Sequence, residues 1–154
     1  MPSAPWWSKL GLVVPLVLLA GVALGLGTTT FVYAEGASYL KNDPEACANC
    51  HVMREQLQGW QTSSHRLVAT CNDCHAPHNT AGKLWVKAKN GFFHSLYFTT
   101  GTFHEPIGIT QSNRAVTQGA CRSCHAPVVE SIDSHAQGEA LDCIRCHRSV
   151  GHLH

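Results

Sequence analysis

The most strongly apolar part of the chain is residues 10–34, which contain no charged side chain. As a helix, this stretch would span about 37 Å, enough to cross the ~30 Å hydrocarbon core of a bilayer. Aromatic residues suited to the two membrane interfaces stand near its ends, at Trp6, Trp7, Phe31 and Tyr33. The pattern predicts a single transmembrane anchor at 10–34, preceded by a short N-terminal segment at 1–9.

The alternative for this stretch is a cleaved signal peptide, with Val32-Tyr33-Ala34 as the cleavage site. The apolar run is longer than the roughly 7–15 residues usual in the centre of a signal peptide, which favours an uncleaved anchor. Lys9 flanks the run on its N-terminal side, and by the positive-inside rule it indicates a cytoplasmic N-terminus.

A second patterned stretch covers residues 81–98. Polar side chains recur there at helical spacing on one face, at Lys83, Lys87, Asn90 and His94. The apolar side chains between them are Leu84, Val86, Ala88, Phe92, Phe93 and Leu96. The pattern predicts an amphipathic helix that either lies along a membrane surface or packs against the interior of the domain.

Composition adds a chemical signal to this outline. The chain has 154 residues and a formal net charge of +1, which gives no indication of a nucleic-acid partner. Its eight cysteines all fall in Cys-x-x-Cys pairs, and each pair is followed directly by histidine. The motifs are Cys47-Ala48-Asn49-Cys50-His51, Cys71-Asn72-Asp73-Cys74-His75, Cys121-Arg122-Ser123-Cys124-His125 and Cys143-Ile144-Arg145-Cys146-His147. This is the attachment signature of c-type haem, so the sequence predicts four covalently bound haems.

Zinc ribbons and disulfides are the alternatives for paired cysteines. Neither needs a histidine directly after each second cysteine, and four such placements by chance have a probability on the order of 10⁻⁵. Haem is attached to c-type cytochromes outside the cytoplasm, so we expect residues 35–154 to form a periplasmic tetrahaem domain. The protein would then be a single-pass protein of the inner membrane.

The spacing of the motifs indicates an internal repeat. They begin at residues 47, 71, 121 and 143, which suggests two two-haem units, around 47–75 and 121–152, with a helix-bearing insertion at 81–112 between them. Ser64-His65 precedes the second motif much as Ser134-His135 precedes the fourth. We expect a mainly α fold with little regular secondary structure, in which porphyrin forms most of the core.

The irons of the predicted haems need axial ligands from the protein. The motif residues His75, His125 and His147 are the expected proximal ligands, and the best distal candidates are His65, His135 and His152. Each distal candidate has the alternative of being a surface or propionate-bonding histidine. The remaining histidines, His78, His94, His104 and His154, are weaker candidates. For the first haem, local reasoning favours His51 as the ligand over the nearby Met53.

Several of these residues also carry a family resemblance. They are the anchor, a first motif that ends in His51-Val52-Met53, the sequence Cys-Asn-Asp-Cys-His-Ala-Pro-His at 71–78, and His152 after the final Cys-His. Together they resemble the NapC/NirT family of membrane quinol dehydrogenases over nearly the whole chain. Lys87-Ala88 followed by His94-Ser95, with the short length, is most similar to the branch that serves cytochrome c nitrite reductase.

The resemblance implies a function and changes some assignments. It implies that the protein oxidises menaquinol and passes the electrons to the pentahaem catalytic subunit of cytochrome c nitrite reductase, which itself reduces nitrite. It favours Met53 over His51 at the first haem, supports His65 and His152 as distal ligands, and places Lys87 and His94 in the quinol pocket. Some relatives carry aspartate at position 94, so His94 would either accept a proton or bind the iron. The alternatives are a quinol dehydrogenase for another reductase, such as one for nitrate, and a passive electron relay.

Overall fold

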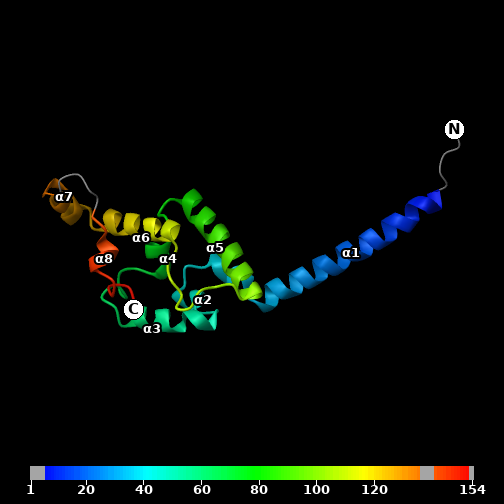
Figure 1. Cartoon of the computed structure of the whole chain (residues 1–154), viewed down its shortest axis with the longest axis horizontal. Coiled ribbons are helices and arrows are strands. Elements are labelled where there is room, and N and C mark those ends of the chain that lie inside the picture. The colour runs from blue at the N-terminus through cyan, green and yellow to red at the C-terminus, as the bar shows by residue number, and fades with distance from the viewer. Residues whose placement is uncertain (1–5, 136–140, 153–154) are drawn as a thin grey trace. The chain divides into compact units, whose positions relative to one another are not determined.

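The computed structural model describes residues 6–135 and 141–152, and their regular elements are all helical. The chain forms two compact units, Met1–Ala37 and Ser38–His154. The elements are α1 (Trp6–Tyr33), η1 (Gly36–Leu40), α2 (Pro44–Cys47), η2 (His51–Met53), α3 (Arg54–Gln61), α4 (Cys71–His75), α5 (Thr80–Thr100), α6 (Gln111–Cys124), α7 (Ala126–His135) and α8 (Cys143–Cys146) (Figure 1). The predicted mainly α fold class is confirmed.

The first unit is built around α1. Its residues Leu10–Tyr33, with a mean hydropathy of 2.4, are long and apolar enough to cross a membrane. Pro15 lies within the helix without ending it, as is tolerated in such helices. The helix is followed by Glu35 at a φ of 49°, and a Cβ at Gly36 would lie 2.4 Å from the Phe31 ring. Glycine at position 36 therefore allows the chain to turn closely past Phe31.

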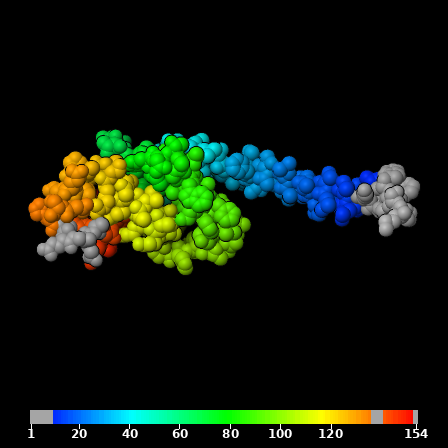
Figure 2. Space-filling model, turned by 90° about the horizontal axis from the view of Figure 1, so that it is seen from above, coloured from blue at the N-terminus to red at the C-terminus, as the bar shows by residue number. Residues whose placement is uncertain are grey.

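The second unit contains the amphipathic helix predicted at 81–98, which the structure confirms as α5. The Asn79 side chain caps its N-terminus by accepting a hydrogen bond of 2.7 Å from the Gly82 amide. Gly101 ends it at a φ of 66°, in the left-handed region that glycine adopts without strain. Figure 2 shows α5 and the residues after it lying open on the visible face of this unit.

Helix α6 packs against α4, α7 and α8. Helices α6 and α7 are longer than the short motif helices that the sequence predicts. Thr110 caps α6 at its N-terminus, and the helix then continues through a polar segment into the third motif. Pro127 falls in the first turn of α7, where proline is compatible with a helix because the first amides have no intrahelical acceptor.

The second unit has very little conventional core. Among the residues whose burial is described, Ala76 is the one buried apolar side chain, at 2% exposure. Large apolar side chains stay open instead, for example Leu67 at 88% and Trp85 at 71%. A protein domain normally buries such groups, so the second unit exposes apolar surface that a large apolar group could cover.

Candidate haem centres

The second, third and fourth motifs share one local structure. In each, the two cysteines lie within a single helical turn: in α4, at the end of α6 and in α8. The histidine closes the turn, since the amides of His125 and His147 each donate to the carbonyl of the motif's first cysteine at 2.9 Å. Two sulfurs and an imidazole are thereby presented from one short helix.

Side-chain caps fix where two of these turns begin. The Thr70 amide and hydroxyl both donate to the Asp73 carboxylate at 2.8 Å, and the Thr70 amide bond is the main reason that the pKa of Asp73 is lowered. Asp142 plays the same part for α8, where it accepts from the Arg145 amide at 3.2 Å. These caps hold the second and fourth motifs in register with the chain before them.

The first motif is built differently. Helix α2 ends at Cys47, Cys50 stands in extended conformation, and His51 begins the separate turn η2 that ends at Met53. The His51 side chain is exposed and lies against Phe98 of α5 with ring centroids 6.5 Å apart, whereas Met53 is half-buried. The first attachment site therefore has its own geometry, and its candidate ligands His51 and Met53 lie at opposite ends of η2.

The four motifs are neighbours in the order of the sequence. A hydrogen bond between the Cys47 and Cys71 side chains links the first to the second, and it lowers the pKa of Cys47 to about 7 while raising that of Cys71. Burial raises the pKa of Cys74, with Cys121 of the third motif as the next contributor. Burial likewise raises the pKa of Cys121, followed by Cys143 of the fourth motif. These sulfurs would be thioethers once haem is attached, but their proximity defines a continuous line of attachment sites.

The residues present fit haem better than zinc or disulfides. All eight cysteines are free thiols. Within residues 6–135 and 141–152, no three or more His, Cys, Asp or Glu side chains gather as a metal-binding group. A structural zinc site needs about four such ligands, whereas porphyrin brings four nitrogens and needs one or two from the protein. The missing apolar core of this unit is a further match.

Two histidine pairs have the separation expected across an iron. His65 and His125 have ring centroids 6.1 Å apart at 76°, and His75 and His152 have centroids 6.1 Å apart at 12°. Two imidazoles bound to one metal through nitrogens about 2 Å away would have centroids about 6 Å apart. The structure therefore brings two predicted distal ligands, His65 and His152, opposite the motif histidines of the third and second sites.

Hydrogen bonds select the tautomer of the candidate ligands. His65 Nδ1 lies 3.0 Å from the Val150 carbonyl and His135 Nδ1 lies 2.7 Å from the Ser131 carbonyl. A carbonyl only accepts, so each Nδ1 carries the proton and each Nε2 is left as a lone-pair donor for a metal. The preceding hydroxyls of Ser64 and Ser134 lie within 3.2 Å of the same nitrogens. The two Ser-His pairs repeated in the sequence therefore also share the same hydrogen-bond geometry at Nδ1.

His75 and His78 differ in their suitability as ligands. Burial, and then the neighbouring His152, lowers the pKa of His75 to about 4, so its imidazole is neutral. Its Nδ1 lies 3.5 Å from the Thr117 hydroxyl, which was not expected from the sequence. His78, in contrast, uses Nε2 to donate to the Asp73 carbonyl at 3.0 Å. That bond occupies the nitrogen His78 would otherwise offer to iron.

His135 lies at a cavity of about 470 Å³ that is lined by Ser131, Ile132, His135 and Leu141. Leu141 is two residues before Cys143, so the cavity adjoins the start of the fourth motif. In the part of the chain that the structure describes, His135 and His147 form no ring pair like the two above. His104 is exposed, and His154 lies outside the described residues.

Helix α5 lies beside the first motif. Lys87 Nζ donates to the Lys41 carbonyl at 2.7 Å, and Asn72 of the second motif donates to the same carbonyl at 3.0 Å. Burial and the nearby Lys83 lower the pKa of Lys87, while Cys47 of the first motif opposes that shift. Lys87, which the sequence singled out, is thus held at the junction of the first two motifs.

His94 lies two turns further along α5 and meets Tyr39, which sequence reasoning missed. The Tyr39 hydroxyl is 3.3 Å from His94 Nδ1. The His94 ring is still open to solvent, but partial burial lowers its pKa. Burial, followed by Cys50 and Cys47, raises the pKa of Tyr39 to about 12, which also places Tyr39 beside the first motif. No local pattern in the sequence links a residue just after the anchor to α5.

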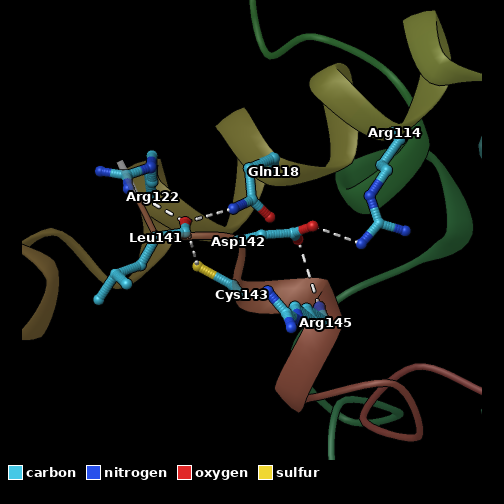
Figure 3. A network of polar contacts seen from close by, with 7 residues as sticks. All are labelled: Arg114, Gln118, Arg122, Leu141, Asp142, Cys143 and Arg145. Carbon is cyan, nitrogen blue, oxygen red and sulfur yellow. Dashed lines mark hydrogen bonds and ion pairs between the residues drawn. The ribbon is translucent and has the colours of Figure 1, made fainter. Parts of the chain in front are cut away.

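A ladder of side chains on α6 holds the segment that leads into the fourth motif (Figure 3). Arg114 forms an ion pair with Asp142 at 2.6 Å, and Gln118 donates to the Leu141 carbonyl at 2.6 Å. Arg122 donates to the same carbonyl at 3.3 Å and forms an ion pair with Asp133 at 2.6 Å. The three donors are spaced four residues apart, so one face of α6 makes all of these contacts.

The fold and the four attachment motifs define a multihaem cytochrome c, and comparison with known proteins agrees. Residues 8–154 match the model of the NapC/NirT cytochrome c family, N-terminal region. The chain belongs to this family, and its cofactor is covalently bound haem c.

Individual relatives are more specific. The chain is 38% identical to the cytochrome c-type protein NrfH of Wolinella succinogenes, over 92% of this chain and 86% of that protein. It is 31% identical to the cytochrome c nitrite reductase subunit NrfH of Nitratidesulfovibrio vulgaris, over 89% of this chain and 83% of that protein. A crystal structure of the cytochrome c nitrite reductase NrfHA complex bound to the HQNO inhibitor contains a similar chain, with a TM-score of 0.65 and 28% identity. That match covers 89% of this chain and 90% of the other.

Proposed function

We propose that this protein is a membrane-anchored tetrahaem quinol dehydrogenase. It oxidises menaquinol at the first haem and delivers the electrons to the pentahaem catalytic subunit of a cytochrome c nitrite reductase. Nitrite is reduced in that partner. The observation that carries the proposal is the set of α5 side chains beside the first motif, at one end of a continuous line of four attachment sites.

The α5 side chains supply the groups that quinol oxidation needs. A quinol loses two protons, so its site needs an acceptor that is neutral at working pH, and the lowered pKa of His94 meets that need. Lys87 lies at the same motif, where its ammonium would stabilise a quinolate oxygen. Lys87 and His94 are therefore the proposed catalytic residues.

The anchor gives this site access to a lipid-soluble substrate. Only residues 34–38 separate Tyr33, the last residue of the apolar helix, from Tyr39. A tether of this length reaches about 20 Å at most when fully extended. The same anchor supports placement in the inner membrane, with the haem domain on the periplasmic side, where haem is attached.

Bound haem supplies one-electron carriers, which separate the two electrons of a quinol and conduct them along the line of attachment sites. The chain's residues hold these carriers: Cys47, Cys50, Cys71, Cys74, Cys121, Cys124, Cys143 and Cys146 as thioether links. We propose His75 with His152 as ligands of the second iron and His125 with His65 as ligands of the third. The 6.1 Å separations of both pairs support this assignment.

The first and fourth sites are assigned on different grounds. At the first, we propose Met53 rather than His51 as the ligand, because Met53 is half-buried and the His51 ring lies against Phe98. At the fourth, we propose His147 with His135 as the distal ligand. The fixed Nδ1 proton of His135 and its place at the cavity before Cys143 support that choice.

The partner is proposed from the relatives. The relative from Nitratidesulfovibrio vulgaris is a subunit of a cytochrome c nitrite reductase, and the similar solved chain belongs to the NrfHA nitrite reductase complex.

The test uses the full-length protein purified in detergent with its haems attached. We expect a menaquinol analogue to reduce it, and we expect nitrite-dependent reoxidation only after the catalytic subunit is added. Failure of quinol to reduce a protein that dithionite reduces fully would make it a passive relay. Reoxidation through a nitrate reductase instead would change the partner and leave the dehydrogenase assignment in place.

The ligand assignments have their own readout. In low-temperature EPR, His65→Ala and His152→Ala should each convert one low-spin haem to high-spin, because each removes one axial nitrogen. His78→Ala is the matched control, since its Nε2 is engaged with the Asp73 carbonyl. A new high-spin signal in the control, or none in the other two, would contradict the assignment.

A further inference from the structure

Tyr39 reaches the proposed site from outside α5 and the motifs. It belongs to η1 and stands 55 residues before His94, with its hydroxyl 3.3 Å from His94 Nδ1. The two ring centroids are 6.3 Å apart and tilted by 53°. The rings therefore meet edge to edge through their polar atoms, as in a hydrogen bond.

Gly91 faces the Tyr39 ring. It lies one turn before His94 on α5, and a Cβ built on it would be in van der Waals contact with the ring, at 3.4 Å. A side chain that extends well beyond Cβ would compete with the ring for this space. The tyrosine consequently lies against the helix backbone, with its hydroxyl directed to the next turn.

The chemistry of the pair is asymmetric. Burial is the main cause of the raised pKa of Tyr39 and does not depend on the cysteine charges, so its hydroxyl stays protonated at working pH. The pKa of His94 is lowered by partial burial, so its imidazole is neutral before turnover. A hydroxyl oxygen can accept from Nδ1–H. With the proton on Nδ1, the lone pair of His94 is on Nε2.

We propose that Tyr39 is a positioning residue for quinol oxidation: its hydroxyl oxygen accepts from His94 Nδ1–H, which orients the ring and leaves Nε2 to accept the substrate's proton. This inference rests on the proposed function and adds to it a residue, Tyr39, outside the proposed catalytic pair. An O–H bond of the quinol breaks and an N–H bond forms at Nε2. The second proton goes to water, and two ferric haems held at the attachment sites would take up one electron each. His94 then returns its proton to water, to which its ring is open.

The test is Tyr39→Phe, which removes one oxygen and keeps the ring that packs on Gly91. We expect kcat for quinol oxidation to fall about fivefold, the effect of one lost hydrogen bond, with KM unchanged because Tyr39 does not touch the substrate. Tyr97→Phe, the same change elsewhere in this unit, should leave both constants unchanged.

The pH profile distinguishes positioning from a structural role. The Tyr39 oxygen stabilises the imidazolium form of His94 by a charge-assisted bond, so its loss should move the acid limb of kcat to lower pH. The titratable groups that face Tyr39 are Cys50 and Cys47 of the first motif. In the assembled protein these sulfurs are thioether links to haem, so they titrate in neither the wild type nor the variant.

A double variant decides whether Tyr39 acts through His94. In a His94→Ala background, Tyr39→Phe should cause no further loss, because the residue it positions is absent. An equal fivefold loss in both backgrounds, or an unchanged rate and pH profile in Tyr39→Phe alone, would overturn the proposal. If Tyr39→Phe assembles with fewer than four haems, Gly91→Leu displaces the ring while keeping the hydroxyl and should give the same kcat loss. If quinol does not reduce the wild-type protein, the proposed function itself is wrong.

Discussion

Two regions of the haem unit hold their polar side chains in different ways. In the α5 region, defined by Tyr39, Lys41, Lys87 and His94, titratable groups bond to neutral partners: Lys87 to a carbonyl and His94 to a hydroxyl. In the α6–α8 region, defined by Arg114, Gln118, Arg122, Leu141 and Asp142, both arginines of α6 bond to carboxylates.

The difference in bonding partners indicates different roles for the two regions. An arginine paired with a carboxylate has its charge compensated and orients the chain around it. A lysine or histidine bonded to a neutral group is held in place while its charge or lone pair is still available to a substrate. The contrast supports the proposal that the α5 region acts on the substrate, whereas the α6–α8 contacts hold the fourth motif against the third.

Removing one side chain from each region tests whether the two regions differ in function. His94→Ala should lower quinol oxidation about 100-fold, the usual contribution of a general base, with dithionite-reducible haem unchanged. Arg114→Met should leave the quinol rate within about twofold, since surface substitutions of this kind cause small changes. Stopped-flow reduction by a menaquinol analogue measures both. Similar losses in the two variants would mean that the regions do not differ in function.

The pH dependence of quinol oxidation tests whether His94 is the general base. A general base works in its neutral form, so quinol oxidation should fall as pH drops through the pKa of His94. Partial burial lowers that pKa below the usual value of about 6.5, so activity should persist at pH 6.5 and then fall about tenfold per pH unit on the acid side. His94→Asp, with the side chain of some relatives, should move the decline to lower pH. A decline centred above pH 6.5 in the wild type would exclude His94 as the base.

Lys87 should have a smaller effect than His94, because it stabilises charge and does not accept the proton. We expect Lys87→Met to lower the quinol rate about tenfold, and Lys87→Arg to recover part of the loss. Lys83→Met is the matched control, since Lys83 lies one turn earlier on the same helix and acts through its charge on the pKa values of Lys87 and Asp73. Equal losses at positions 83 and 87 would point to general surface charge as the cause.

The sequence predicted what is encoded locally. Each haem motif is a short contiguous signature, and the apolar run and the α5 pattern are periodic, so anchor, cofactor and α5 could all be predicted. Pairings between distant residues could not, because nothing near Tyr39 signals His94 and nothing near His65 signals His125. Helix α6 was missed because its polar residues form no apolar stripe, and the break in the first motif was missed because Ala48-Asn49 contains no helix-breaking proline.

Breaking the ladder of contacts on α6 should lower thermal stability only slightly. Arg114 and Asp142 are 30% and 42% exposed, so their ion pair should contribute little to stability, as is usual for solvent-screened pairs. Arg114→Met and Asp142→Asn should each lower Tm by about 2–4 °C, Asp142→Asn somewhat less because an asparagine oxygen still caps the Arg145 amide. The double variant should lose less than the sum of the two, as expected for partners in one interaction. Strictly additive losses in thermal unfolding of the haem-loaded protein would show that Arg114 and Asp142 act independently, and that α6 positions the fourth motif through Gln118 and Arg122 alone.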